Sequence, residues 1–280
     1  MKRFTYILFL FFFVAKGLCA QKNCNVYKYR GDDTCYVACK TAIQADQYQE
    51  GSQASQILLS RSINQCSNMD YAYYRKSIPY LKSGDFVEWR RLIDQAVEIN
   101  PAVYLGYRGW CRFNFLRDFD GALSDINQLD KMYDGDIGYA DSGVYHLNVI
   151  KALCFKEKGQ TRKAIRIMEA QFKTIKYVPG YYDYLHLGVM KLEAQDFEGA
   201  ERALQKQIVH NDYVAETYFF LALAKQGIGK TYESLHLLET AYEKYKKGER
   251  RYSPYTSPID KIYLIDIENE LARLGSLSER

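Results

Sequence analysis

Hydrophobic positions recur at helical spacing through most of the chain. In residues 80–101, YLKSGDFVEWRRLIDQAVEINP, the apolar positions after Gly84 are three or four residues apart, which places them on one face of a helix. They are Phe86, Trp89, Leu92, Ile93, Ala96, Val97 and Ile99. A second helical face, with Tyr73, Ser77, Tyr80 and Leu81, precedes the turn at 82–85, and Pro101 follows the later helix. The stretch predicts a helical hairpin.

The same order of elements returns along the chain. A small residue stands near the middle of each expected first helix, at Ser77, Cys111, Ala152, Gly188 and Ala222, with separations of 34, 41, 36 and 34. The matching positions of the second helices are Trp89, Ala122, Ala164, Ala200 and Ser234. A period near 34 residues with two helices per unit indicates hairpins that stack on one another, because a single hairpin cannot bury its own apolar face.

This pattern resembles the tetratricopeptide repeat family over residues 35–247. The resemblance is strongest in YLKSGDFVEWRRLIDQAVEINP, YDYLHLGVMKLEAQDFEGAERAL and ETYFFLALAKQGIGKTYESLHLLETA. Trp89 departs from it, since the family has alanine there, and the turn of the third hairpin is one residue short. The resemblance implies an all-α, right-handed superhelical solenoid of stacked hairpins. It also implies that a protein or peptide binds in a concave groove lined by the first helices.

The first twenty residues have the layout of a secretory signal peptide. Basic residues Lys2 and Arg3 precede an apolar run over 5–15, and cleavage is expected before Gln21. The run is short for a bilayer span, so a retained anchor, like lipidation of Cys19, is a minor alternative. Three of the 38 basic residues lie here, which leaves 35 basic and 34 acidic residues in the mature chain. A nearly neutral chain argues against nucleic-acid binding. We expect an exported, most simply periplasmic protein without a further membrane span.

The remaining chain divides into three expected segments. Residues 21–34 form an N-terminal segment with cysteine, residues 35–247 form the repeats, and residues 248–280 form a linker and a capping helix. Ser257 followed by Pro258 predicts the start of that helix, and Gly275 predicts its end. Its apolar stripe is Ile259, Tyr263, Ile267, Leu271 and Leu274. A solenoid needs such a helix to cover its last apolar face.

The cysteines near the N-terminus are disulfide candidates. Cys66 ends the second helix of the first hairpin, and antiparallel packing brings it near the start of the first helix. We therefore expect Cys66 to pair with Cys35 or Cys39, and Cys24 to take the remaining one. Cys111 and Cys154 occupy small-residue positions inside first helices, where we expect buried thiols.

No catalytic or metal-binding constellation is evident in the sequence, and no cofactor is expected. The four histidines, His146, His186, His210 and His236, fall in different repeats, so they are interpreted as surface or groove residues rather than metal ligands. Asp134, Asp136 and Asp141 lie in the longest insertion, over 134–143. They form either a plain acidic loop, the favoured interpretation, or a calcium site that lacks the usual loop pattern. Phosphate-loop and nucleophile-elbow motifs are also missing.

The repeat register predicts which side chains line the groove. Positions two, five, nine and twelve of the first helices are Tyr71, Tyr74, Ile78, Leu81, Leu105, Arg108, Arg112, Phe115, His146, Val149, Leu153, Lys156, Tyr182, Leu185, Val189 and Leu192. Arg108 and Arg112 are one helical turn apart, so they can grip one carboxylate of a partner. The alternative is that both arginines pair with nearby acids of the chain itself.

These features favour a non-catalytic scaffold in the bacterial envelope that binds a protein or peptide partner. One alternative is a structural spacer or self-associating subunit whose groove is filled by its own chain or by a neighbouring copy. A less favoured alternative is an enzyme or a metal-dependent binding protein built on a helical solenoid.

Overall fold

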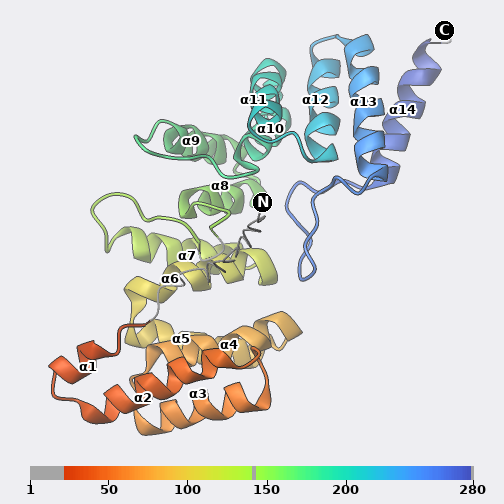
Figure 1. Cartoon of the computed structure of the whole chain (residues 1–280). Helices are drawn as coiled ribbons and strands as arrows, with labels where there is room; N and C mark the ends of the chain where they lie inside the picture. The colour runs from red at the N-terminus through yellow and green to blue at the C-terminus, as the bar shows by residue number, and fades with distance from the viewer. Residues whose placement is uncertain (1–21, 141–142, 279–280) are drawn as a thin grey trace, which may run out of the picture. The chain divides into compact units, whose positions relative to one another are not determined.

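The computed structural model of the chain describes residues 22–140 and 143–278, and their regular structure is helical apart from one isolated β-bridge (Figure 1). The expected signal peptide and its cleavage site before Gln21 lie outside these residues. No helix in the described part is long and apolar enough to cross a membrane. The chain forms two compact units that divide after Ile78, inside helix α4 (Asp70–Ser83). Pro79 stands at the division, where it removes a backbone donor from the helix.

The first unit is a hairpin held by two disulfides. Its elements are α1 (Asn25–Tyr29), α2 (Asp33–Gln44), a short 3₁₀-helix (Ala45–Gln47), α3 (Gln53–Gln65) and the beginning of α4. Cys35 bonds Cys66 and Cys24 bonds Cys39, which confirms the expected pairing. These cysteines pack with a core of Ala38, Ala42, Leu59 and Met69.

The second unit is a stack of helical hairpins. After α5 (Phe86–Ile99) come the pairs α6 (Pro101–Cys111) with α7 (Phe119–Asp130), α8 (Leu147–Glu157) with α9 (Thr161–Phe172), α10 (Asp183–Glu193) with α11 (Phe197–His210), and α12 (Ala215–Gly227) with α13 (Thr231–Lys246). The two helices of each pair pack together, and successive pairs also touch (Figure 1). The prediction of an all-α solenoid is confirmed.

A repeated local signal closes several of these hairpins. Gly84, Arg117 and Gln195 adopt left-handed backbone conformations with φ of 84°, 55° and 60°. Each is followed by an aspartate that caps the second helix, through backbone N–H groups at 3.1, 2.8 and 2.9 Å. A phenylalanine comes next in all three turns. The left-handed residue reverses the direction of the chain. The aspartate accepts a hydrogen bond from a backbone N–H in the first turn of the second helix, which has no partner within that helix.

The small-residue positions of the repeat are buried as predicted. All ten have little or no solvent contact, including Trp89, the one large residue among them. Gly188 shows why size matters, because a Cβ atom built on it would lie 2.5 Å from Leu204 Cγ of the facing helix. The repeat therefore reflects close approach between the helices of a hairpin.

The third hairpin absorbs its short turn by widening the first helix. Residues Arg112–Leu116 continue α6 as a π-helix, and the N–H of Asp118 donates to the carbonyl of Arg112 at 3.0 Å. Wider hydrogen-bonded turns of this kind accommodate a change of register inside a helix.

The predicted boundaries of the C-terminal helix are wrong. Helix α14 (Leu264–Ser278) begins seven residues beyond Ser257 and continues through Gly275. It packs against α13 and buries Ile267 and Leu274, as a capping helix does. The segment 257–263 is not helical, because Ile259 and Asp260 are bound by other parts of the unit and Asp260 takes a left-handed conformation with φ of 59°.

Candidate functional site

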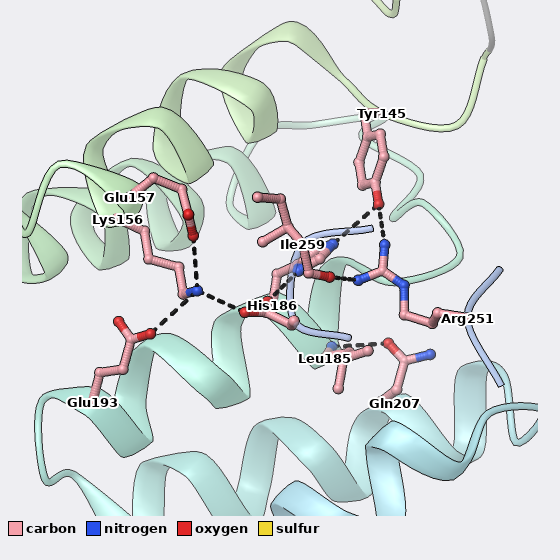
Figure 2. A network of polar contacts seen from close by, with 10 residues as sticks. Tyr145, Lys156, Glu157, Leu185, His186, Glu193, Gln207, Arg251 and Ile259 are labelled. Carbon is pink, nitrogen blue, oxygen red and sulfur yellow. Dashed lines mark hydrogen bonds and ion pairs between the residues drawn. The ribbon is translucent and has the colours of Figure 1, made fainter. Parts of the chain in front are cut away.

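A long connection runs from α13 back toward the middle hairpins of the second unit (Figure 1). We call residues 247–263 the return loop. It contacts α8, α10 and α12, the first helices of three hairpins. Figure 2 shows the part of this polar network that involves α8 and α10. We call the surface of these three helices the first-helix face. The return loop thus lies across the surface where the resemblance places the binding groove.

Asp260 is the centre of the network. Its carboxylate accepts a hydrogen bond from Lys156 Nζ of α8 at 2.6 Å and another from His186 Nδ1 of α10 at 2.6 Å. Burial alone would raise the pKa of Asp260, but the contacts with His186 and Lys156 outweigh it and lower the pKa to about 2. Lys156 also pairs with Glu157 and Glu193, each at 3.2 Å. Asp260 is therefore a buried, ionised carboxylate that joins two hairpins.

His186 connects this carboxylate to Arg251 of the return loop. The hydroxyl of Tyr145 lies 3.1 Å from His186 Nε2, and Arg251 Nη2 donates to that hydroxyl at 2.7 Å. Burial and the nearby Arg251 lower the pKa of His186 despite the hydrogen bond to Asp260. A neutral ring with its proton on Nδ1 satisfies both contacts, since it donates to Asp260 and accepts from Tyr145. The chain of hydrogen bonds runs from Arg251 through Tyr145 to His186, as Figure 2 shows, and continues from His186 to Asp260.

The return loop is also bound through its backbone and its apolar side chains. The N–H of Arg251 donates to both carboxylate oxygens of Glu216 of α12, at 3.1 and 3.2 Å, and its guanidinium lies 4.5 Å from the ring centre of Tyr182. The same guanidinium donates to the carbonyl of Ile259. Ile262 packs into the core formed by α12, α13 and α14. The first-helix face therefore recognises main-chain, charged and apolar groups of an irregular segment.

A pocket of about 230 Å³ lies beside the return loop. Trp110, Phe113 and Asn114 form the side contributed by α6 and the π-helix, whereas Tyr252, Ser253 and Thr256 belong to the loop. Tyr145 and Tyr182 also line it. Aromatic rings with a few polar groups at the edge are typical of surfaces that hold part of a ligand.

The two arginines predicted to grip a partner are paired within the second unit. Arg108 makes a two-pronged contact with Asp125, at 2.9 and 2.7 Å, and also reaches Asp94 at 2.8 Å. Arg112 Nη1 lies 3.1 Å from Asp125. Asp125 is buried, so these pairs compensate its charge. Arg108 and Arg112 therefore follow the alternative prediction, in which both arginines pair with acidic residues of the chain itself.

Five predicted groove residues are fully buried and do not reach a surface. Val149 and Leu185 are core residues. His146 accepts from the N–H of Asn148 as the cap of α8, and its other ring nitrogen lies 2.6 Å from Asp136. His146 therefore holds the acidic insertion through Asp136. This role follows from its position at the start of α8, which the repeat register does not indicate. Leu105 and Leu153 are buried as well.

The remaining predicted groove residues are dispersed. In the first unit, Tyr71 donates to Asp46 at 2.5 Å, its ring centre lies 6.4 Å from that of Tyr74, and Ile78 is buried. In the second unit, Leu81 and Val189 are buried, and Phe115 and Leu192 are partly buried. Of the predicted set, Lys156 and Tyr182 contact the return loop. Binding of a partner at these positions stays a prediction.

The histidine interpretation is wrong for two of the four side chains. His146 and His186 are fully buried, whereas His210 and His236 are exposed. Within the described residues, no group of three or more His, Cys, Asp or Glu side chains is placed to hold a metal ion. Asp141, a candidate calcium ligand, lies outside those residues.

Cys154 is buried, and its burial raises its pKa to about 12.

Solved structures with the same arrangement of helices support these observations. PilW, a widely conserved type IV pilus biogenesis factor, matches with a TM-score of 0.58 at 15% identity, over 78% of this chain and 96% of PilW. The Cut9–Hcn1 hetero-tetramer of APC/C matches at 0.57 and 11% identity, over 90% of this chain and 44% of that one. YrrB, a TPR protein with an unusual peptide-binding site, matches at 0.51 and 9% identity, over 67% of this chain and 92% of YrrB. The chain has the tetratricopeptide-repeat fold.

Comparisons of the sequence itself give no such match. No protein-family model matches the chain, and none of the curated proteins is similar to it.

Sequence reasoning missed most of the network around the return loop. Lys156 and Asp260 are 104 positions apart, and His186 and Asp260 are 74 apart. No local pattern links positions so distant. Arg251 and Asp260 lie outside the repeats, where no register assigns a direction to a side chain.

Proposed function

We propose that this chain is an exported protein-interaction scaffold of the bacterial envelope, which binds an extended segment of a partner on the first-helix face. The observation that carries the proposal is the return loop. The face holds this irregular segment through Lys156, His186 and Glu216, which come from three successive hairpins. A surface that binds one extended segment by its backbone and side chains has the chemistry to bind another.

Other observations support the compartment. Residues 1–20 resemble a signal peptide, and the two disulfides of the first unit suit an oxidising environment. The likeness to PilW, a pilus biogenesis factor, is in keeping with an envelope assembly.

A second candidate function is a structural spacer. The return loop fills part of the first-helix face with the chain's own residues, which is the arrangement expected of a spacer that needs no partner there. The two functions differ in what they recruit, because a scaffold captures a partner in fixed ratio and a spacer associates with itself.

Cross-linking in intact Gram-negative cells tests the proposal. A chain with its own residues 1–20 and a C-terminal tag should be recovered with Gln21 at its N-terminus and with one stoichiometric partner, both identified by mass spectrometry. The variant W110A/N114A, at the wall of the pocket that faces the return loop, should reduce capture about tenfold, since aromatic contacts dominate binding at such surfaces.

Y232A is the matched control, because Tyr232 is an exposed tyrosine of α13 away from the pocket lining. Capture should be unchanged in Y232A. Capture by W110A/N114A equal to that of wild type would place the partner elsewhere on the molecule. Recovery of the tagged chain with other copies of itself alone would support the spacer.

A further inference from the structure

The return loop is fastened at two places and exposed between them. Arg251, Ile259 and Ile262 are buried, with 5%, 8% and 3% of their surface exposed. Between them, Tyr252 and Tyr255 are 78% and 56% exposed, and the loop has no helix over 250–263. The loop is therefore anchored at Arg251 and again between Ile259 and Ile262, where Ile262 enters the core of α12, α13 and α14, and its middle part is exposed. Segments with few buried contacts open at lower free energy than the core.

The attachment completes a set of buried polar groups. Without Asp260, His186 Nδ1 loses its acceptor. Lys156 then keeps its pairs with Glu157 and Glu193, which are more exposed than Asp260. Buried polar and charged groups are costly when they have no partner. The first-helix face is therefore not stable empty, and it favours any segment that brings a carboxylate to the place of Asp260.

The return loop does not use all of the available surface. The pocket of about 230 Å³ next to it is lined by Trp110 and Asn114, on the side of α6 and the π-helix, and by Tyr182. A longer or differently shaped segment at the same face gains this surface in addition to the carboxylate site. These additional contacts with the pocket allow a segment of a partner to compete with the return loop, which is tethered to the same chain.

We propose that the return loop is a resident placeholder, and that the partner displaces it with an extended segment carrying a carboxylate directly after a branched apolar residue. The inference rests on the proposed function and names the partner's chemistry. Ile259 and Asp260 define that chemistry, because the first is buried and the second is bound by two hairpins. The tether gives the resident segment an effective concentration on the order of millimolar, so a short free peptide competes poorly with it.

A labelled peptide of the loop's own sequence, YTSPIDKIY (residues 255–263), tests the placeholder. Fluorescence anisotropy should show binding to the variant I259A/D260A at least tenfold tighter than to the wild-type chain, because the variant releases the resident segment. The same peptide with asparagine in place of aspartate should lose most of this gain. Adding K156M to the variant should remove it too.

Circular dichroism and thermal melting establish that I259A/D260A is folded. A folded variant that binds the peptide no better than wild type, or binds the aspartate and asparagine peptides equally, overturns the proposal. Should the double variant unfold, a protease site inserted after the exposed Tyr255 replaces it. The cleaved chain must then bind the aspartate peptide in preference to the asparagine peptide, and failure to do so is equally decisive.

The cellular capture experiment separates this inference from the function on which it rests. I259A/D260A should capture more partner than wild type. Equal capture by both chains keeps the scaffold and removes the placeholder, whereas capture of no partner by either chain removes the scaffold.

Discussion

Single residues decide how closely the helices of a hairpin approach. Gly188 of α10 faces Leu204 of α11, and an added Cβ would lie 2.5, 2.7 and 3.1 Å from three of its carbon atoms. Leu204 is itself fully buried, so it has little room to move. The glycine is therefore required by packing, and its backbone needs no left-handed conformation.

We predict that G188A destabilises the chain by about 1–3 kcal/mol, the usual cost of overpacking a core. Denaturant unfolding followed by circular dichroism measures the change. G275A is the matched control, since Gly275 is also helical but a Cβ there meets nothing within 4 Å. It should be neutral or slightly stabilising, because alanine favours a helix over glycine. An unchanged midpoint for G188A would show that the hairpin tolerates a wider separation.

At the scale of elements, local signals and covalent links fix the hairpins. The first hairpin has N-caps at Asp32 and Ser52, and its helices are joined by the Cys35–Cys66 disulfide. That bond closes a loop of 31 residues, which in the chain-entropy model contributes about 3–4 kcal/mol by restricting the unfolded chain.

We predict that C35A/C66A unfolds at a lower denaturant concentration than the oxidised wild-type chain. Reductant should lower the midpoint of the wild-type chain, and it should lower that of C35A/C66A less, since only Cys24–Cys39 remains to be reduced. C154A is the control, because Cys154 takes no part in either disulfide. The unfolding midpoint of C154A should fall on addition of reductant by as much as that of the wild-type chain. A reduced thiol at Cys66 in protein from an oxidising compartment, found by non-reducing peptide mapping, would contradict the assignment.

At the scale of the whole chain, the hairpins were predictable and the return loop was not. Small residues such as Ala152 and Ala164 repeat with the period of the fold, and each is buried for the same reason. The sequence Ser257–Pro258 has the local features of a helix start, yet the helix begins at Leu264. Contacts of Asp260 with α8 and α10 outweigh that local preference. Repeat patterns report neighbouring hairpins, whereas a single segment folded back across several hairpins has no periodic signal.

The buried network makes the stability of the chain depend on pH. Burial and Arg251 lower the pKa of His186, so the folded chain holds this ring neutral while the unfolded chain protonates it near its ordinary value of 6.5. The unfolded state then binds more protons, and stability falls as the pH drops below 6.5. The groups that face the ring are Tyr145, Asp260 and Arg251, with Asp183 nearby. Asp260, whose pKa is lowered from 3.8 to about 2, adds a second loss between those values.

We predict that the wild-type chain loses stability through His186 as the pH falls below 6.5, with a slope that approaches about 1.4 kcal/mol per pH unit once the unfolded ring is fully protonated. Glu193 and Glu216 act in the opposite direction, because burial raises their pKa values, so the effect is read as the difference between wild type and H186Q. Denaturant unfolding from pH 7.5 to 5 should show a shallower slope for H186Q. H236Q changes an exposed histidine of α13 and should keep the wild-type slope. Equal slopes for wild type and H186Q would mean that His186 titrates alike in the folded and unfolded chain, and the neutral pathway from Arg251 to Asp260 would then be wrong.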